Sequence, residues 1–385
     1  MYSLLLAIIY LCFIALGLPD SLLGAAWPVM QGELSVPISY LGVLTMITSL
    51  STILSSLFTG RLINRFGTGT VTAASIALTT LALFGYSVSP SFPVLCILAV
   101  PYGLGAGAVD ASLNSYVALH YSSRHLNWLH AFWGVGITLS PSIMSYCLSL
   151  EWGWRSGFST VFIAQLVITA VIVASIPLWK RGGVGDEEQG RNIPLMRALK
   201  MRGFVFVLLA FFISCAIEAT AGLWASSYFV GRLGVLPEAA AAFASLFFLG
   251  ETAGRFASGL VSSRLGDKAM IRIGLVLMAL GGIVLVLSYK SVPLSLVGLL
   301  LLGFGIAPIY PSLVHMTPPA FGRDASASLM GTEMAFAYLG TTFMPSIFGA
   351  FAEGVGVFLY PAFLASFVIV LIFSSEMFFA SAKNN

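Results

Sequence analysis

The chain contains 385 residues, of which 58% are hydrophobic and 9% are charged, and its formal net charge is +3 at pH 7. Because soluble domains carry about 25% charged residues, this composition excludes a water-soluble globular protein. Apolar runs of about 20 residues recur along the whole chain, and they do not alternate in hydrophobicity as the strands of a membrane barrel do. We therefore predict an all-α polytopic membrane protein.

Twelve membrane-spanning helices are predicted from these runs. The first run has no basic residues ahead of it and continues past Asp20, so it is predicted to be a span and not a signal peptide. The longest hydrophilic stretch follows the sixth span. In chain order the predicted spans are 3–31, 37–63, 69–88, 93–121, 125–150, 156–179, 203–231, 237–264, 269–288, 293–318, 323–352 and 355–380.

Basic residues fall mainly in the loops on one side of this arrangement. Most of the 18 Lys and Arg residues lie in loops that share a side with both termini. Because cytoplasmic loops are enriched in Lys and Arg, we expect both termini in the cytoplasm and the protein in the cytoplasmic (inner) membrane. This orientation accounts for the net positive charge without a nucleic-acid partner. The expected partners are a small-molecule substrate and the lipid bilayer, and the expected state is a monomer.

The two halves of the chain repeat one another. The hydrophilic stretch at 180–202 is predicted to be a cytoplasmic linker between two pseudo-symmetric six-helix bundles, residues 1–179 and 203–385. Such repeats are typical of secondary transporters, whose substrate site lies near the membrane midplane. The corresponding positions are 60–67 with 259–266, Gly103 and Gly105 with Gly303 and Gly305, Gly136 and Pro141 with Gly340 and Pro345, and Asp20 and Gly24 with Glu218 and Gly222.

Several ionisable residues lie deep in the predicted spans, where a charge costs about 2.5–3.5 kcal/mol on insertion scales. Asp110 lies roughly 15 Å from the inner end of its helix, near the midplane. It shares a helix face with Asn114, four residues on. Hydrogen bonds between helices would explain one such residue. Asp20, Glu218 and Glu333 are predicted near the depth of Asp110, and several acids at one depth in both halves indicate a polar path. The ionisable residues deep in the spans are Asp20, Asp110, His130, Glu218, Glu251, Arg255 and Glu333, of which His130 is predicted nearer the cytoplasm.

Two chemical roles are predicted for these residues and their neighbours. Asp20 and Asp110 are the predicted proton-coupling residues, because a neutralised acid can cross a closed, dry intermediate that a charged one cannot. Asn114 could form paired hydrogen bonds to a neutral polar solute. Tryptophan and tyrosine could stack on a sugar ring or belong to interfacial belts. The predicted substrate-binding residues are Asn114, His130, Trp133, Trp27, Glu218, Trp224, Glu251, Arg255, Tyr310 and Glu333.

Glu251 and Arg255 leave two roles open. They are four residues apart in the order that favours an ion pair within one helix. The pair could lock the structure or contact the substrate. Arg255 is the one Lys or Arg placed deep within a predicted span, so an anionic substrate also stays open.

Residues 60–67 after span 2 and 259–266 after span 8 share the pattern Gly-x-x-x-x-Arg-x-Gly. This pattern resembles the loop motif of the major facilitator superfamily. This resemblance implies a cytoplasmic gate that includes Arg61, Asn64, Arg65 and Arg264, although the family's usual aspartate is replaced by Asn64 here and by Ser263 in the second half. Asp20 together with residues 108–114 is similar to the fucose-permease group, and residues 129–141 are similar to the sodium-dependent glucose transporter branch. The fucose-permease resemblance implies proton symport through Asp20 and Asp110. It also aligns His130, which can titrate near neutrality, with a glutamine.

The sequence carries no signature of an enzyme. It has no Walker loop and no His-Glu-x-x-His motif, and we expect no metal and no cofactor. Gly103, Gly105 and Ala108 are predicted to serve helix packing and not dinucleotide binding. The predicted function is secondary active transport of a small polar solute, a sugar being the preferred class, by proton symport with alternating access. The alternatives are a proton- or sodium-coupled exporter of drugs or metabolites, and a non-transporting receptor or lipid-handling protein. Drug antiporters of the superfamily that the chain resembles typically carry Gly-Pro-x-x-Gly-Gly in span 5, and its absence here favours uptake over export.

Overall fold

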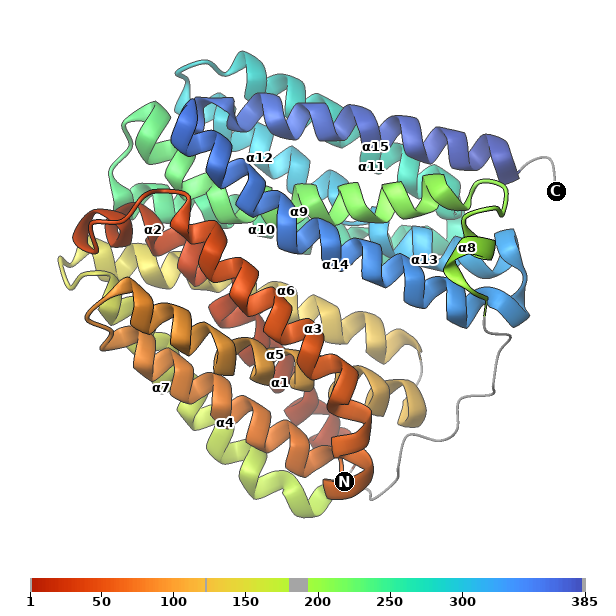
Figure 1. Ribbon diagram of the computed structural model, residues 1–385, viewed down its shortest axis with the longest axis horizontal. Helices are drawn as coiled ribbons and strands as arrows, with labels where there is room; N and C mark the ends of the chain where they lie inside the picture. The colour runs from red at the N-terminus through yellow and green to blue at the C-terminus, as the bar shows by residue number, and fades with distance from the viewer. Residues whose placement is uncertain (1, 122, 180–192, 383–385) are drawn as a thin grey trace. The chain divides into compact units, whose positions relative to one another are not determined.

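The computed structural model describes residues 2–121, 123–179 and 193–382, and within them it contains helices and no strand (Figure 1). The predicted all-α fold class is therefore confirmed. Residues 180–192 of the predicted linker lie outside the described residues. The helices are α1 (Tyr2–Asp20), α2 (Leu22–Glu33), α3 (Tyr40–Phe66), α4 (Thr68–Ser87), α5 (Phe92–His120), α6 (Ser123–Ser149), α7 (Trp154–Ser175), α8 (Leu195–Ala198), α9 (Phe204–Leu233), α10 (Pro237–Leu265), α11 (Asp267–Leu287), α12 (Val292–Ile306), α13 (Ile309–Phe321), α14 (Arg323–Gly354) and α15 (Tyr360–Ala382), with short 3-10 turns at Ile176–Leu178 and Val357–Leu359.

Eleven apolar segments of the described chain are long enough to cross a membrane. The predicted span 237–264 corresponds to α10, a helix of 29 residues that is not one of the eleven. Glu251 and Arg255 stand inside its apolar run and lower its hydropathy. Since a helix of that length reaches about 44 Å, α10 is still long enough to span a bilayer.

Two of these eleven segments contain a break in the helix. The span Leu4–Glu33 consists of α1 and α2, which separate at Ser21, and its hydroxyl donates to the Ile137 carbonyl over 2.7 Å. The span Val292–Phe321 consists of α12 and α13, which separate at Ala307 and Pro308. Pro308 has no N–H for the helical ladder, which explains the second break. The first break places Asp20 at the end of a helix, where backbone groups leave the regular ladder.

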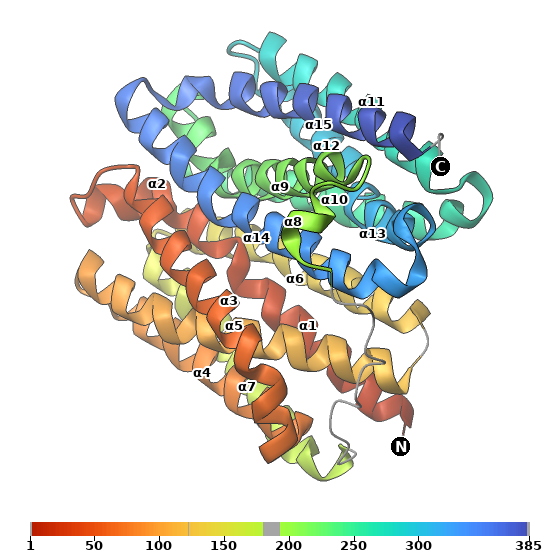
Figure 2. The same cartoon turned by 45° about the vertical axis from the view of Figure 1, so that its right-hand side comes forward.

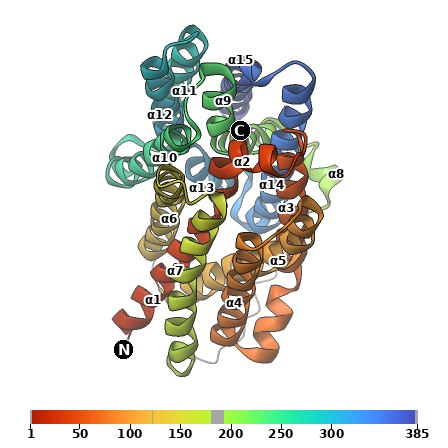
Figure 3. The ribbon, with the colours of Figure 1, turned by 90° about the vertical axis from the view of Figure 1, so that its left-hand side faces the viewer.

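Backbone contacts group the chain into two compact units. The first contains Met1–Gly185 with Ala225–Ser245, and the second contains Asp186–Trp224 with Leu246–Asn385. In the first unit α7 runs alongside α1 and α4 (Figure 3). In the second unit α11 packs alongside α15 (Figure 2). The predicted domain boundary at 180–202 stays a prediction.

The sequence repeat reappears as a repeat of helix contacts, each made inside one unit. Gly103 lies so close to α3 that an added Cβ would overlap the Thr48 carbonyl, and Gly303 meets the Phe247 carbonyl of α10 in the same way. Small residues permit this close approach of backbones, as the sequence predicted for Gly103 and Gly105. Two further matched pairs are Gly105 against Ser75 with Gly305 against Gly274, and Gly136 against Ile14 with Gly340 against Phe212.

Candidate functional site

Asp20 joins three helices of the first unit. Its Oδ1 accepts a hydrogen bond from the Tyr102 hydroxyl of α5 over 2.9 Å, and its Oδ2 accepts one from Trp133 Nε1 of α6 over 2.8 Å. Asp20 itself is exposed and not sealed in helix packing. The carboxyl group therefore has a donor on each oxygen, and both donors are neutral.

Asp110 and Asn114 form a second polar pair one turn apart on α5. Asn114 Nδ2 donates to Asp110 Oδ1 over 2.8 Å and to the Asp110 carbonyl over 3.0 Å. Both side chains are half-buried, and Asp110 lies within electrostatic range of Asp20. Because Tyr102 is eight residues before Asp110, one face of α5 carries the hydrogen-bond partner of Asp20 and the second acid.

His130 and Trp133 lie on α6 close to α1. The exposed His130 ring meets Phe13 edge-on, with 5.6 Å between ring centroids. Trp133 is half-buried, and its indole N–H is bonded to Asp20. Hydrogen bonds and electrostatic interactions therefore connect Asp20, Asp110, Asn114 and Trp133 on α1, α5 and α6 of one unit, and His130 lies one turn before Trp133 on α6. We call these five residues the acid site.

Two of the predicted stacking residues are instead buried in helix packing. Trp27 is fully buried and donates from Nε1 to the Ile38 carbonyl over 3.0 Å. Trp224 is 1% exposed and donates to the Pro345 carbonyl over 2.9 Å. These contacts favour a structural role, and a contact of either indole with substrate stays a prediction.

One arginine and two glutamates form a charged cluster in the second unit. Arg255 forms an ion pair with Glu251 in α10 and a second one with Glu218 of α9, whose N–O distance is 3.6 Å. The side chain of Glu251 is 2% exposed, while Arg255 and Glu218 are 22% and 25% exposed. The predicted pairing of Glu251 with Arg255 is confirmed. Tyr310 of α13 lies within electrostatic range of Arg255 and meets Phe211 edge-on.

Glu333 of α14 does not interact with this charged cluster. It is 1% exposed, and the Thr317 hydroxyl of α13 lies 2.9 Å from each of its carboxyl oxygens. Its predicted contact with substrate stays a prediction. The structure places Glu333 among the most buried polar residues of the second unit.

The predicted gate residues lie at helix ends. Arg61, Asn64 and Arg65 are exposed in the last turns of α3, and Arg264 is exposed at the end of α10. The Arg61 guanidinium lies 5.7 Å from the centre of the Phe58 ring, and Arg65 lies 5.2 Å from that of Phe66. These contacts are local to the helix, so a gating function stays a prediction.

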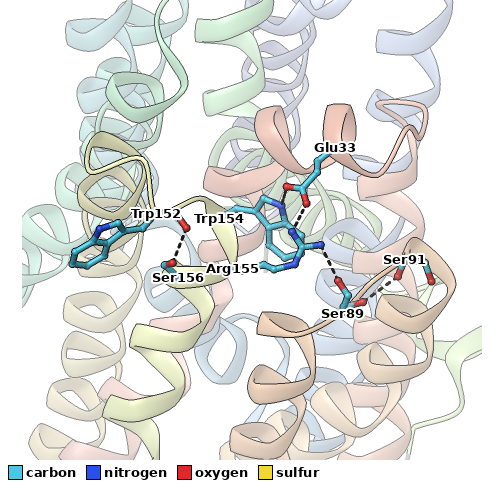
Figure 4. Close-up of polar contacts among 7 residues, drawn as sticks. All are labelled: Glu33, Ser89, Ser91, Trp152, Trp154, Arg155 and Ser156. Carbon is cyan, nitrogen blue, oxygen red and sulfur yellow. Dashed lines mark hydrogen bonds and ion pairs between the residues drawn. The ribbon is translucent and has the colours of Figure 1, made fainter.

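A polar clasp at the opposite end of the first unit was not predicted from the sequence (Figure 4). Glu33, at the end of α2, accepts a hydrogen bond from Trp154 Nε1 over 2.6 Å and forms an ion pair with Arg155. Arg155 also donates to the Ser89 carbonyl over 3.0 Å. The clasp ties the end of α2 and the start of α7 to the turn before α5. The sequence did contain a signal for this clasp, because Glu33 follows the first predicted span and Trp154 and Arg155 directly precede the sixth.

Sequence reasoning missed two residues that form hydrogen bonds to the predicted acids: Tyr102, which bonds to Asp20, and Thr317, which bonds to Glu333. Tyr102 lies at a four-residue multiple from Asp110, which was a usable signal for a shared face. Thr317 lies on a different helix from Glu333, and no spacing rule connects the two residues.

The helices, the buried acids and the internal repeat define a membrane transporter, and the family comparison agrees. The family model of the Major Facilitator Superfamily matches residues 9–244 and 207–382. The chain belongs to this superfamily and is a transporter, not an enzyme.

Individual relatives support the same family. The chain is 26% identical over 345 residues to the uncharacterized transporter y4wD of Sinorhizobium fredii, covering 85% of each chain. It is 23% identical to bypass of stop codon protein 6 of Saccharomyces cerevisiae, covering 94% of this chain and 80% of that protein. It is 31% identical over 144 residues to the niacin transporter NiaP of Acinetobacter baylyi, covering 35% of this chain and 33% of that protein.

A solved structure shares the fold. It is a bacterial homolog of the human lysosomal transporter Spinster, in an inward-facing and occupied conformation. The likeness covers 100% of this chain and 97% of that chain, with a TM-score of 0.73 and 12% identity. At this identity the likeness concerns the fold alone.

Proposed function

We propose that the protein takes up a small neutral polar solute together with protons, by alternating access of its two halves. A sugar is the preferred substrate class. The observation that carries this proposal is the hydrogen bonding of Asp20 to Tyr102 and Trp133, with Asp110 in electrostatic range. We place the protein, as a monomer, in the cytoplasmic membrane with both termini in the cytoplasm.

The acid site can couple a proton to a solute because its two acids repel one another when both are ionised. A proton on one of them removes that repulsion and the cost of carrying two charges through a dry intermediate. Asp110 is the better carrier, since the amide of its partner Asn114 can both donate and accept and so suits either protonation state. Trp133 Nε1 can only donate, which suits Asp20 as an ionised acceptor that positions the three helices.

A neutral solute agrees with the charges in the second unit. Arg255 is the cation that an anionic solute would need, and it already interacts with Glu251 and Glu218. An anion would have to compete with both carboxylates. The hydroxyl groups of a neutral solute could instead bond to Asn114 and His130 and lie against the Trp133 ring. The name of one relative, a niacin transporter, makes an aromatic carboxylate the alternative class.

The proposal is tested with purified protein in vesicles, with a pH indicator in the outer medium. Addition of a transported sugar outside is expected to make the outer medium more alkaline, as protons enter with the sugar. Sugars and nicotinic acid are compared, with sodium present or absent. A response that needs sodium and moves no protons would contradict proton symport. Binding by the purified protein without any transport would support a receptor, and efflux against an inward proton gradient would support an exporter.

A further inference from the structure

Glu333 is a buried acid that the acid site does not use. Its side chain is 1% exposed, and both carboxyl oxygens lie 2.9 Å from the Thr317 hydroxyl. One hydroxyl proton can satisfy one oxygen at a time, so the other oxygen has no donor among the described residues. Burial on this scale is unusual for a glutamate without a charged partner.

The charged groups of the surrounding helices are engaged elsewhere. His315 of α13 pairs with Asp267 over 2.7 Å, and Arg272 of α11 forms two hydrogen bonds to Glu376 of α15. Basic residues also lie in and after α8, whose apolar residues pack against the start of α14: Arg197 is in α8, and Lys200 and Arg202 follow it. Among the described side chains, none of these charges interacts with Glu333. The side chains of Arg323 and Asp324, which open α14, are outside those described.

This environment suits a protonated carboxyl group. An ionised carboxylate that is buried without a cation costs several kcal/mol, so such a group takes up a proton instead. The Thr317 hydroxyl can donate to an ionised carboxylate or accept from a protonated one, so it serves both forms. Glu251 differs, because protonation would leave Arg255 without half of its counter-charge.

We propose that Glu333 and Thr317 form a second proton-binding site, which the transporter loads and empties in each cycle. The carboxylate of Glu333 takes up one proton from water and returns it to water, with no other reactant. This inference rests on the proposed proton symport and extends it: two protons accompany each neutral solute, one on the acid site and one on Glu333.

An infrared titration tests the proton on Glu333 without any solute. The full-length protein is taken through a pH change, and the carbonyl stretching band of protonated carboxyl groups is followed. Glu333→Gln is expected to remove one titrating component of this band. Glu353→Gln, the same change at an exposed position of the same helix, is expected to leave it in place. Thr317→Val is expected to keep that component and move it to higher frequency, because the protonated carboxyl group loses its hydrogen-bond partner. An unchanged titration in Glu333→Gln would overturn the proposal, as would a Glu333 band that never titrates.

The number of protons per solute tests its part in transport. Vesicles carry a tenfold proton gradient at zero membrane potential, and a radiolabelled hexose is the probe. Two coupled protons give an accumulation of about a hundredfold at equilibrium, and one gives about tenfold. We expect about a hundredfold in the wild type and in Glu353→Gln, and about tenfold in Glu333→Gln. A wild type at tenfold, or Glu333→Gln at a hundredfold, would overturn the second site. If the wild type does not accumulate the hexose, the proposed sugar symport fails, while the infrared result still decides the proton on Glu333.

Discussion

The two units share a scaffold, but the acid site of the first unit and the charged cluster of the second hold their acids in opposite ways. In the first unit Asp20 and Asp110 are held by neutral donors from Tyr102, Trp133 and Asn114. In the second unit Glu251 is paired with an arginine. An acid held by neutral donors can gain a proton without stranding a cation, whereas protonation of Glu251 would leave a buried charge with less compensation. The difference assigns proton exchange to the first kind of acid and structural locking to the second.

The largest effect on stability is expected when Glu251 loses Arg255, the cation with which it forms an ion pair. Arg255→Ala leaves Glu251 buried without its ion-pair partner and should lower the free energy of unfolding by about 3–5 kcal/mol. The measurement is reversible unfolding in mixed micelles. The double variant Arg255→Ala with Glu251→Gln removes the stranded charge and should recover most of the loss. A single variant as stable as the wild type would contradict the locking role.

The shared scaffold is tested by a matched pair of glycine substitutions. Gly103→Ala and Gly303→Ala each force a methyl group against a backbone carbonyl, and each should cost about 1–3 kcal/mol of unfolding free energy. Gly331→Ala is the control, because it meets nothing within 4 Å and should be neutral or stabilising. Costs that differ strongly between the two units would break the equivalence.

A matched pair of tryptophans separates a functional hydrogen bond from a structural one. Trp224→Phe removes a buried hydrogen bond to the Pro345 carbonyl and should lower the unfolding free energy by about 1 kcal/mol. Trp133→Phe removes a donor from an exposed acid that water can reach, so its stability should change less while proton-coupled uptake falls. The same unfolding assay and the vesicle assay are compared for both variants. Normal coupling in Trp133→Phe would remove the positioning role of that indole.

The smallest effect is expected at the clasp between Glu33 and Arg155. Both side chains are more than a third exposed, Glu33 at 47% and Arg155 at 35%. Exposed ion pairs contribute about 0.2–1 kcal/mol, so Glu33→Gln should lower the unfolding free energy by no more than that and leave proton coupling intact. High salt should reduce the difference between this variant and the wild type. A loss of coupling would show that the clasp belongs to the transport cycle.

The sequence predicted the features that depend on composition and spacing. Apolar runs identified the spans, and the recurring glycines identified contacts that the two units share, because close helix packing depends on small residues at fixed positions. Asp20 and Asp110 stood out because charges are costly in a membrane.

The partners of these acids depend on helix breaks and helix rotation, which spacing does not reveal. The break at Ser21 ends α1 at Asp20, and Thr317 meets Glu333 from another helix. The eighth predicted span, α10, also shows the limit of composition, since its interior ion pair makes a long helix less apolar. Stacking roles were predicted for Trp27 and Trp224 from residue type alone, and the structure shows both indoles buried.

The most direct measurement compares proton-driven accumulation in two carboxyl-to-amide variants. Asp110→Asn removes an acid held by a neutral donor, and Glu251→Gln removes one held by an arginine. Under an imposed tenfold proton gradient, Asp110→Asn is expected to lose the proton carried by the acid site, so that its accumulation falls about tenfold below that of the wild type. It should still exchange solute across the membrane. Glu251→Gln is expected to keep the wild-type number of protons per solute, even if it is less stable. The opposite pattern, with wild-type accumulation in Asp110→Asn and reduced accumulation in Glu251→Gln, would contradict the assignment of proton exchange to the acid site.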